Sequence, residues 1–247
     1  MSIFDTPKIR FISHRGFQPM APENSLPSFA YAGALGQWAI ETDVRMTADG
    51  ELVCCHDDSV ERCFNGEGSV KDMTYSELSG LRMIRGNRLE CFDGDELRIP
   101  KFSEYLAICK RFGSVPFIEL KTNDVERVMH EVRKTGFSDG EVVISSIVLS
   151  HLTESRRCSS GAFLHWIFAD ENRLLEFSEL GNVGYSLMIG DVFTCPAEKI
   201  AVAHDMGMKI CLRAGDNVET LKHMQRIGLD YIPTNCMHEK LYGGDGK

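Results

Sequence analysis

Short apolar runs alternate with longer segments of helical periodicity from one end of the chain to the other. The short runs have the length and composition of strands, and the longer segments have the apolar spacing of helices. The predicted strands are Lys8–Ser13, Ala39–Val44, Val115–Leu120, Glu141–Ser145, Ala162–Phe168, Gly184–Ile189, Lys209–Arg213 and Asp230–Pro233. The clearest predicted helices are Ser25–Leu35, Phe102–Arg111, Val125–Lys134, Pro196–Met206 and Val218–Ile227.

Glycine follows several of these helices directly before the next strand, at Gly36, Gly136, Gly207 and Gly228. A helix that ends in glycine and leads into a strand is the usual connection of α/β folds. Eight strands that alternate with helices predict a closed (β/α)8 TIM barrel, with a doubly wound open sheet as the alternative. No linker or repeat divides the 247 residues, so we expect a single domain over 1–247.

One further strand interrupts the alternation. Residues 51–55 follow Val44 too closely for a crossover helix, and Asp49-Gly50 is a hairpin turn signal. We therefore predict an antiparallel ribbon in which residue 43 lies opposite residue 55, so that His56 returns to the level of Glu41 and Asp43. The polar stretch 57–98 then predicts an insertion over the barrel mouth, containing a short helix capped near Thr74.

Composition and charge limit the possible partners. The formal net charge of −9 argues against a general nucleic-acid coat, which needs clustered Lys and Arg. No apolar run reaches the length of a membrane span and no signal-peptide pattern occurs, so the expected compartment is the cytoplasm. Nine cysteines without a C-x-x-C pair fit reduced thiols rather than disulfides or zinc ligands. The sequence does not predict an oligomeric state.

Polar residues gather where the first predicted strands end, which in a barrel is the face that carries the active site. They are His14, Arg15, Glu41, Asp43, His56, Glu119 and Lys121. Glu41 and Asp43 stand two apart on one strand and therefore share a face, where Glu119 adds a third carboxylate. Three oxygen ligands favour one divalent cation, Mg²⁺ or Ca²⁺. The alternative is that these acids pair with Arg15, Arg45 or Lys121.

The two histidines and the two basic residues complete a set of groups suited to phosphate chemistry. Histidine titrates near neutral pH, so His14 and His56 are candidates for an acid–base pair, although a single histidine at a strand end is commonly structural. Arg15 can bind a phosphate through two parallel hydrogen bonds, and Lys121 offers a point charge. Gly16 would allow close approach of the backbone to a substrate. Phosphodiester cleavage needs these functions together.

The sequence closely resembles the glycerophosphodiester phosphodiesterase family. The resemblance rests on motifs in family order across the first half of the chain: His14-Arg-Gly16, Pro22-Glu-Asn-Ser25, Glu41-Thr-Asp43, Thr47-Ala-Asp-Gly50, His56-Asp57, Gly66-Glu-Gly68, Met73-Thr-Tyr-Ser-Glu-Leu78, Ile99-Pro100 and Ile118-Glu-Leu-Lys121. It implies a barrel of the phosphatidylinositol-phosphodiesterase type that releases sn-glycerol 3-phosphate and an alcohol. It also implies His14 and His56 as catalytic residues, with Glu41, Asp43 and Glu119 as metal ligands and with Arg15 and Lys121 on the phosphate.

The second half of the chain departs from the family pattern. A Trp-Thr-Val-Asn-like strand end is replaced by Cys211-Leu-Arg-Ala214, and the usual Thr-Asp of the last strand is Thr234-Asn235. Arg213 is either an extra contact for an anionic substrate or a peripheral ion pair. Trp166 either stacks on a headgroup or packs in the core.

Three functions are compared. The leading one is hydrolysis of a small soluble glycerophosphodiester, with either water or the neighbouring glycerol hydroxyl as the nucleophile. The second is a related phosphodiesterase acting on lysophospholipid or sphingolipid, for which the insertion offers apolar residues at Met73, Tyr75, Met83, Ile84 and Phe92. The third is a catalytically silent phosphate-binding barrel.

Overall fold

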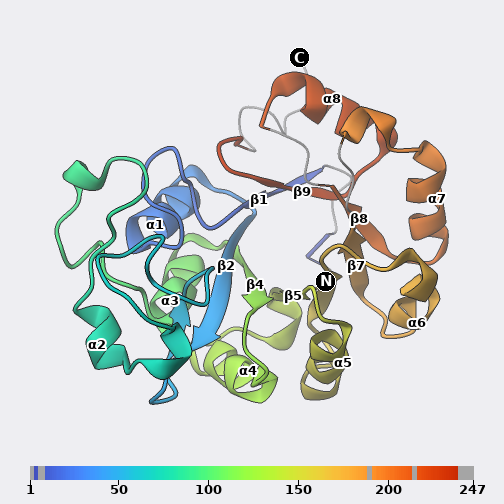
Figure 1. Ribbon diagram of the computed structural model, residues 1–247. Helices are drawn as coiled ribbons and strands as arrows, with labels where there is room; N and C mark the ends of the chain where they lie inside the picture. The colour runs from blue at the N-terminus through green and yellow to red at the C-terminus, as the bar shows by residue number, and fades with distance from the viewer. Residues whose placement is uncertain (1–2, 5–8, 188–190, 213–215, 239–247) are drawn as a thin grey trace.

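The computed structural model describes residues 3–4, 9–187, 191–212 and 216–238. Eight parallel strands close into a barrel, because β1 pairs with both β2 and β9 (Figure 1). The strands are β1 (Arg10–Ser13), β2 (Ala39–Met46), β4 (Val115–Leu120), β5 (Val143–Ser146), β6 (Phe163–Trp166), β7 (Val183–Ser186), β8 (Lys209–Cys211) and β9 (Tyr231–Thr234). The predicted TIM barrel is confirmed and the open sheet is excluded.

Helices follow the strands and form the outer layer of the barrel (Figure 1). They are α1 (Leu26–Leu35), α3 (Phe102–Phe112), α4 (Val125–Lys134), α5 (Leu149–Cys158), α6 (Leu174–Ser178), α7 (Ala197–Asp205) and α8 (Val218–Ile227), with short 3₁₀ turns η3 (Asp139–Glu141), η4 (Glu171–Arg173) and η5 (Val192–Thr194). The predicted bounds differ from these by no more than three residues at either end; residues 8, 188, 189 and 213 of three predicted strands lie outside the described residues. Helices α5 and α6 had no strong sequence signal, because α5 is largely polar and α6 has only five residues.

Glycine ends two of the helices as predicted. Gly36 and Gly228 are the C-caps of α1 and α8, and their φ angles of 75° and 84° lie in the left-handed region. Both amides donate to carbonyls of the last helical turn, which would otherwise be unsatisfied. The chain therefore leaves each helix sharply and returns to the barrel within a few residues.

The predicted ribbon is present with the predicted register. Strand β3 (Leu52–Cys54) pairs antiparallel with β2, and Val44 lies opposite Cys54. The next step of the ladder is a hydrogen bond from the Cys55 amide to the Asp43 carbonyl, 2.9 Å long. This register returns the chain to the barrel mouth at His56, beside the carboxylates of β2.

Residues 57–98 form a small layer beside the ribbon, with η1 (Val70–Asp72), α2 (Tyr75–Ser79) and η2 (Leu89–Cys91) (Figure 1, left). Thr74 caps α2 with a capping box to Glu77, as its sequence predicted. The layer has an apolar cluster of its own, joined to the ribbon through Val53 and Cys55. That cluster fixes the insertion against the side of the barrel mouth that carries His56.

Large side chains fill the interior of the barrel away from the carboxyl ends of the strands. Ile12, Phe117, Phe163 and Tyr231 pack there with small neighbours, and the Tyr231 hydroxyl meets the imidazole of His165. Burial lowers the pKa of His165 to about 3, so this histidine is neutral. The closed floor leaves the carboxyl ends of the strands as the open end of the barrel.

Candidate active site

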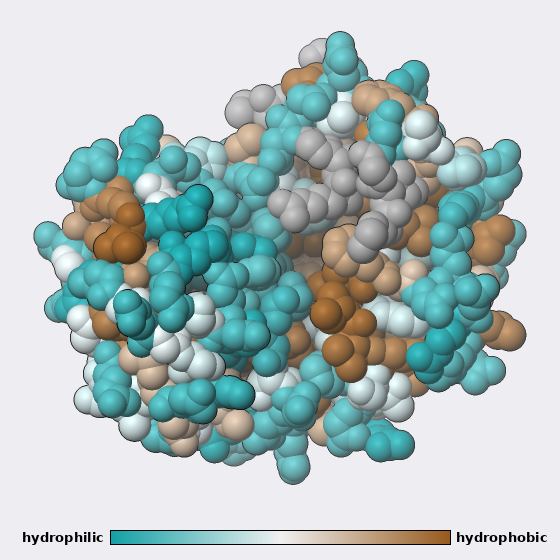
Figure 2. All heavy atoms as spheres, viewed as in Figure 1, coloured by the Kyte–Doolittle hydropathy of each residue, from teal (hydrophilic) through white to brown (hydrophobic). Residues whose placement is uncertain are grey.

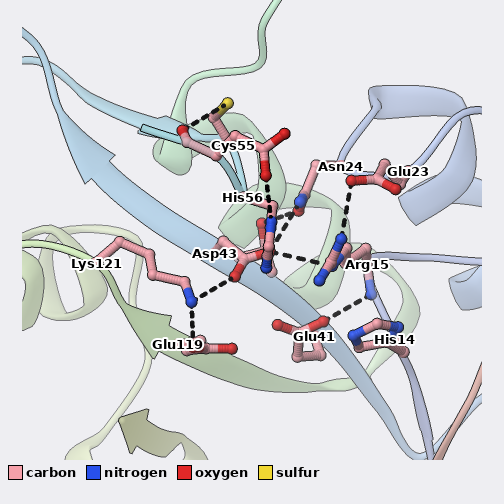
Figure 3. Close-up of polar contacts among 12 residues, drawn as sticks. His14, Arg15, Glu23, Asn24, Glu41, Asp43, Cys55, His56, Glu119 and Lys121 are labelled. Atoms are coloured by element: carbon pink, nitrogen blue, oxygen red, sulfur yellow. Dashed lines mark hydrogen bonds and ion pairs between the residues drawn. The ribbon is translucent and has the colours of Figure 1, made fainter. Parts of the chain in front are cut away.

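A cavity of about 210 Å³ opens at the carboxyl ends of the strands. Six of the seven residues singled out in the sequence line it, namely His14, Arg15, Glu41, His56, Glu119 and Lys121. The seventh, Asp43, is fully buried beside Glu41 and Glu119 (Figure 3). The barrel therefore brings together residues that are up to 107 positions apart in the sequence.

The three carboxylates form one cluster. Glu41, Asp43 and Glu119 each place an oxygen within 4.8 Å of the others, because β2 and β4 are neighbours and Asp43 stands opposite Glu119 in their register. One oxygen of Glu41 accepts the Arg15 amide at 2.7 Å, and one oxygen of Asp43 accepts the Asn24 amide group at 3.0 Å. The other oxygens, Glu41 Oε1 and Asp43 Oδ1, have no hydrogen bond within the described parts of the chain.

Burial and repulsion act together on this cluster. Desolvation and the charges of Asp43 and Glu119 raise the pKa of Glu41 well above its usual range. Desolvation and Asp43 also raise the pKa of Glu119. Carboxylate oxygens within 4.8 Å of one another, with Glu41 Oε1 and Asp43 Oδ1 making no hydrogen bond in the described parts of the chain, fit a hard divalent cation. The donor set contains neither sulfur nor nitrogen, which disfavours zinc.

Arg15 and Lys121 contact the same acids. Arg15 Nε lies 3.4 Å from Asp43 Oδ2, and Lys121 Nζ lies 3.5 Å from Asp43 Oδ1 and hydrogen-bonds to Glu119. The ion pairs that formed the alternative interpretation of the carboxylates are thus present for two of the three basic residues. Both cations also line the cavity, so they are placed to contact an anion bound there.

The loop after β1 holds Arg15 in an unusual conformation. Arg15 has a φ of 56°, in the left-handed region that non-glycine residues rarely adopt, and Gly16 follows at 84°. A Cβ on Gly16 would lie 2.3 Å from Ser28 Oγ, so only glycine fits between this loop and α1. The tight turn aims the Arg15 amide at Glu41 while its side chain reaches Asp43.

His14 and His56, two of the three histidines that line the cavity, are each held through Nδ1. His56 Nδ1 lies 2.6 Å from Asp57 Oδ1, and His14 Nδ1 lies 3.0 Å from Asn235 Oδ1. Both partner oxygens are acceptors, so Nδ1 carries the hydrogen in each ring and Nε2 is the basic nitrogen. Arg45, predicted as a possible partner of the acids, instead donates to the carbonyl of His56 at 2.6 Å.

A chain of ion pairs connects His56 to Arg15. Asp57 accepts from Arg62 as well as from His56, and Arg62 Nη2 lies 2.6 Å from Glu23 Oε1. The same Glu23 oxygen lies 3.0 Å from Arg15 Nη1. Burial opposes ionisation of Asp57 and Glu23, but hydrogen bonds from their basic partners outweigh it and lower the pKa of both. Arg62 belongs to the insertion, so the insertion affects the charge around His56 through the Arg62–Asp57 ion pair.

Sequence reasoning missed several supporting residues. Asn24 was quoted only as part of a motif, yet it orients Asp43 and accepts the Thr42 hydroxyl at 2.7 Å. Asn235 was noted as a departure from the family and holds His14. Glu23 was likewise quoted only within that motif, and Arg62 gave no signal, because its partners lie in other segments of the sequence.

Two further residues, Trp166 and Arg213, each had two possible interpretations in the sequence. Trp166 is buried against Phe177, with ring centroids 5.4 Å apart, so it packs in the core and does not stack on a headgroup. Arg213 lies outside the described residues. No helix in the described ranges is long and apolar enough to cross a membrane.

Comparison with known proteins links this geometry to one family. The model of the glycerophosphoryl diester phosphodiesterase family matches residues 14–235. A glycerophosphodiester phosphodiesterase of Caldanaerobacter subterraneus is 36% identical over 146 residues, covering 56% of this chain and 58% of the relative. Human glycerophosphodiester phosphodiesterase 1 is 30% identical over 147 residues, covering 60% of this chain and 44% of the relative. The matched segment thus spans about half the length of these curated relatives.

Solved structures share the fold over nearly the whole chain. A glycerophosphoryl diester phosphodiesterase-like protein from Silicibacter pomeroyi aligns with a TM-score of 0.80 at 24% identity, covering 95% of this chain and 92% of the other. A phosphodiesterase from Oleispira antarctica, solved with the product sn-glycerol 3-phosphate, aligns with a TM-score of 0.82 at 20% identity, covering 95% and 96%. With the family match over residues 14–235, the chain belongs to the glycerophosphoryl diester phosphodiesterase family.

Proposed function

We propose that this protein hydrolyses glycerophosphodiesters to sn-glycerol 3-phosphate and an alcohol. The observation that carries the proposal is that one cavity brings together a carboxylate cluster, two basic side chains and the histidines His14 and His56. Family membership supports the reaction class. The Oleispira protein, which binds sn-glycerol 3-phosphate on the same fold, supports the product. A silent barrel is disfavoured because every residue that the chemistry needs borders the cavity or the cluster.

One divalent cation, Mg²⁺ or Ca²⁺, would be held by Glu41, Asp43 and Glu119. When bound, it supplies positive charge next to a phosphoryl oxygen. Arg15 and Lys121 would hold the remaining nonbridging oxygens, Arg15 through its planar guanidinium and Lys121 as a point charge. Both now contact carboxylates of the cluster, so the charges that they present to a phosphate are already positioned.

His14 and His56 would exchange the protons. The attacking oxygen gives its proton to one imidazole as its bond to phosphorus forms. The bond from phosphorus to the alcohol oxygen then breaks, and the second imidazole donates a proton to that oxygen. Both rings have Nδ1 occupied by an acceptor, which aligns Nε2 for each transfer. The attacking oxygen belongs either to water or to the adjacent glycerol hydroxyl, in which case a cyclic phosphate precedes the product.

The insertion would form part of one domain with the barrel and would support His56. It supplies Arg62, and its cluster is continuous with the ribbon that ends at His56. The apolar acceptor surface suggested for it is not supported: Met83 is buried, and Met73, Tyr75 and Phe92 pack against the cluster. Only Ile84 is well exposed, at 57%. All nine cysteines are free, which is compatible with a cytoplasmic location.

A panel of soluble glycerophosphodiesters tests the reaction. With Mg²⁺ or Ca²⁺ we expect stoichiometric release of glycerol 3-phosphate, and with chelator we expect loss of at least about 10²-fold in turnover. Phosphorus NMR during the reaction would reveal a cyclic phosphate if the glycerol hydroxyl attacks. Cation binding without turnover of any diester would refute the proposal.

Removing either imidazole tests the acid–base pair. His14→Ala and His56→Ala should each lower kcat by about 10²–10⁴-fold while sparing the fold and cation binding. His130→Ala, at an exposed histidine on α4, is the matched control and should retain full turnover. Turnover that survives in either cavity variant would remove that histidine from the mechanism.

Neutralising one buried carboxylate separates stability from cation binding. Ionised Glu41 is repelled by Asp43 and Glu119, so above its raised pKa it destabilises the cation-free fold. At pH 8 with chelator, Glu41→Gln should therefore stabilise the protein by about 1–2 kcal/mol. The gain should shrink as the pH falls, because wild-type Glu41 then binds a proton. Added cation should stabilise the wild type much more than the variant.

Thermal unfolding with and without cation measures both effects of that substitution. Glu126→Gln, at an exposed position on α4, is the control and should change neither value. A Glu41→Gln variant that is less stable than wild type in chelator would show that the cluster is not repulsive.

Asp57 and Arg62 should act on His56 in opposite directions. Asp57→Asn removes a negative charge beside His56 and should move the His56-dependent limb of the pH–rate profile to lower pH. Arg62→Met leaves Asp57 un-neutralised and should move the limb to higher pH. Arg82→Met, in an exposed ion pair of the same insertion, should leave the profile unchanged. Shifts of the same sign in both variants would indicate a merely structural role.

A further inference from the structure

The two sides of the cavity mouth differ in polarity. The catalytic candidates come from β1, β2, the ribbon and β4, whereas the loops after β5 and β6 contribute Ile147, Ile167 and Phe168. Figure 2 shows this difference at the central hollow, with mostly hydrophilic atoms along its left edge and a hydrophobic group across from them. The apolar side is called here the lip, defined by Ile147 and Phe168.

The lip is exposed to solvent rather than buried in the core. Ile147 is 57% exposed and Phe168 is 45% exposed, and Val148 next to Ile147 is 40% exposed. Single exposed apolar residues are common on protein surfaces, but neighbouring ones that border a ligand cavity mark binding surfaces. The two residues are neighbours because they follow paired strands, where Ser146 lies opposite Trp166.

The lip is also held in place. Phe168 has a φ of 53°, a conformation that is unfavourable for a bulky side chain, and its amide donates to Ser186 Oγ at 3.1 Å. The carbonyl of Ile147 accepts the indole N–H of Trp166 at 3.2 Å. The fold therefore keeps an aromatic ring exposed in a strained conformation without burying it. Strain of this kind concentrates at ligand sites.

The dimensions suit a substrate with an apolar extension. A cavity of about 210 Å³ is smaller than the usual range of about 300–1,000 Å³ for drug-sized ligands, so a long substituent must pass over the rim. Adjacent strands lie about 4.8 Å apart, which places the loops after β5 and β6 roughly 5–10 Å from the strand of Glu119. That is the distance from a phosphate, across a glycerol or a short alcohol, to the start of an alkyl chain.

We propose that the lip binds the alkyl chain of a single-chain glycerophosphodiester, so that this enzyme prefers amphiphilic diesters to those without a chain. The inference rests on the proposed function and specifies its substrate class. The alkyl chain of the substrate is carried either on the glycerol, as in a lysophospholipid, or on the leaving alcohol. Both place the diester against the carboxylate cluster and the chain over Ile147 and Phe168.

Two series of diesters distinguish the sources, each compared at monomeric concentrations with the chainless diester of the same headgroup. One series carries a ten-carbon acyl group on the glycerol, and the other carries a ten-carbon alkyl group on the alcohol. We expect kcat/KM to be higher by about 10-fold or more in one series. If kcat/KM is equal or lower in both series while the chainless diester is hydrolysed, the lip does not bind the alkyl chain, but the proposed function stands.

Substitutions in the lip test its residues directly. Phe168→Asn suits a left-handed backbone and should preserve the fold, and Ile147→Asn removes the neighbouring apolar surface. Each should reduce the ratio of kcat/KM for the chain-bearing diester to that for the chainless one by about 5–10-fold. Leu175→Asn, at a 69% exposed residue of α6 outside the cavity lining, is the control and should leave the ratio unchanged. An equal fall in the control would overturn the assignment.

Binding gives a readout that does not depend on turnover. Calorimetry should find one chain-bearing phosphate, either acylated glycerol 3-phosphate or a ten-carbon alkyl phosphate, bound at least about 10-fold more tightly than its chainless counterpart, and Phe168→Asn should remove the difference. If no diester is hydrolysed, the proposed function fails, and these affinities still test whether the lip binds an alkyl chain. Sedimentation checks the other occupant: a wild-type dimer that Phe168→Asn dissociates would assign the lip to a second copy of the chain and refute the proposal.

Discussion

Repulsion between two buried carboxylates and a third, half-buried one is the constraint on which the rest of this site depends. Glu41, Asp43 and Glu119 are brought within 4.8 Å by the pairing of β2 with β4, so the barrel that creates the site also concentrates its negative charge. Unpaired buried charge is costly, and Arg15 and Lys121 offset it only in part, since the pKa of Glu41 remains raised. The site is thus built for a positive charge that the protein does not itself supply in full.

The surrounding contacts follow from that constraint. Asn24 and the Arg15 amide each fix one oxygen of a carboxylate and leave the second directed at the cluster. This arrangement keeps the acids from turning towards solvent, which they would otherwise do to reduce their repulsion. The strained φ of Arg15 has the same consequence, because only that turn aims its amide at Glu41. A similar relation holds at His56, where Asp57 is balanced by Arg62 and Glu23.

The sequence predicted the barrel, the ribbon register and the carboxylate cluster because each depends on local pattern and strand geometry. Asp49-Gly50 sets the position of the turn, and this position places residue 43 opposite residue 55. The supporting contacts were less accessible. Arg62 pairs with Glu23 across 39 residues and His14 with Asn235 across 221, and no periodicity encodes such partners. The polar surface of α5 likewise concealed a helix whose few buried residues suffice for packing.

The residues proposed for the chemistry and those proposed to select the substrate lie in different parts of the chain. The proposed catalytic and cation-binding residues lie between His14 and Lys121, where the chain resembles its family most closely. Ile147 and Phe168 lie beyond them, in the loops after β5 and β6, outside the family motifs found in the sequence. Loops at a barrel mouth change without disturbing the strands that hold the chemistry. The proposed lip after β5 and β6 would therefore select amphiphilic diesters without any change to the acids, histidines and basic residues that are proposed to act on the phosphate from β1, β2, the ribbon and β4.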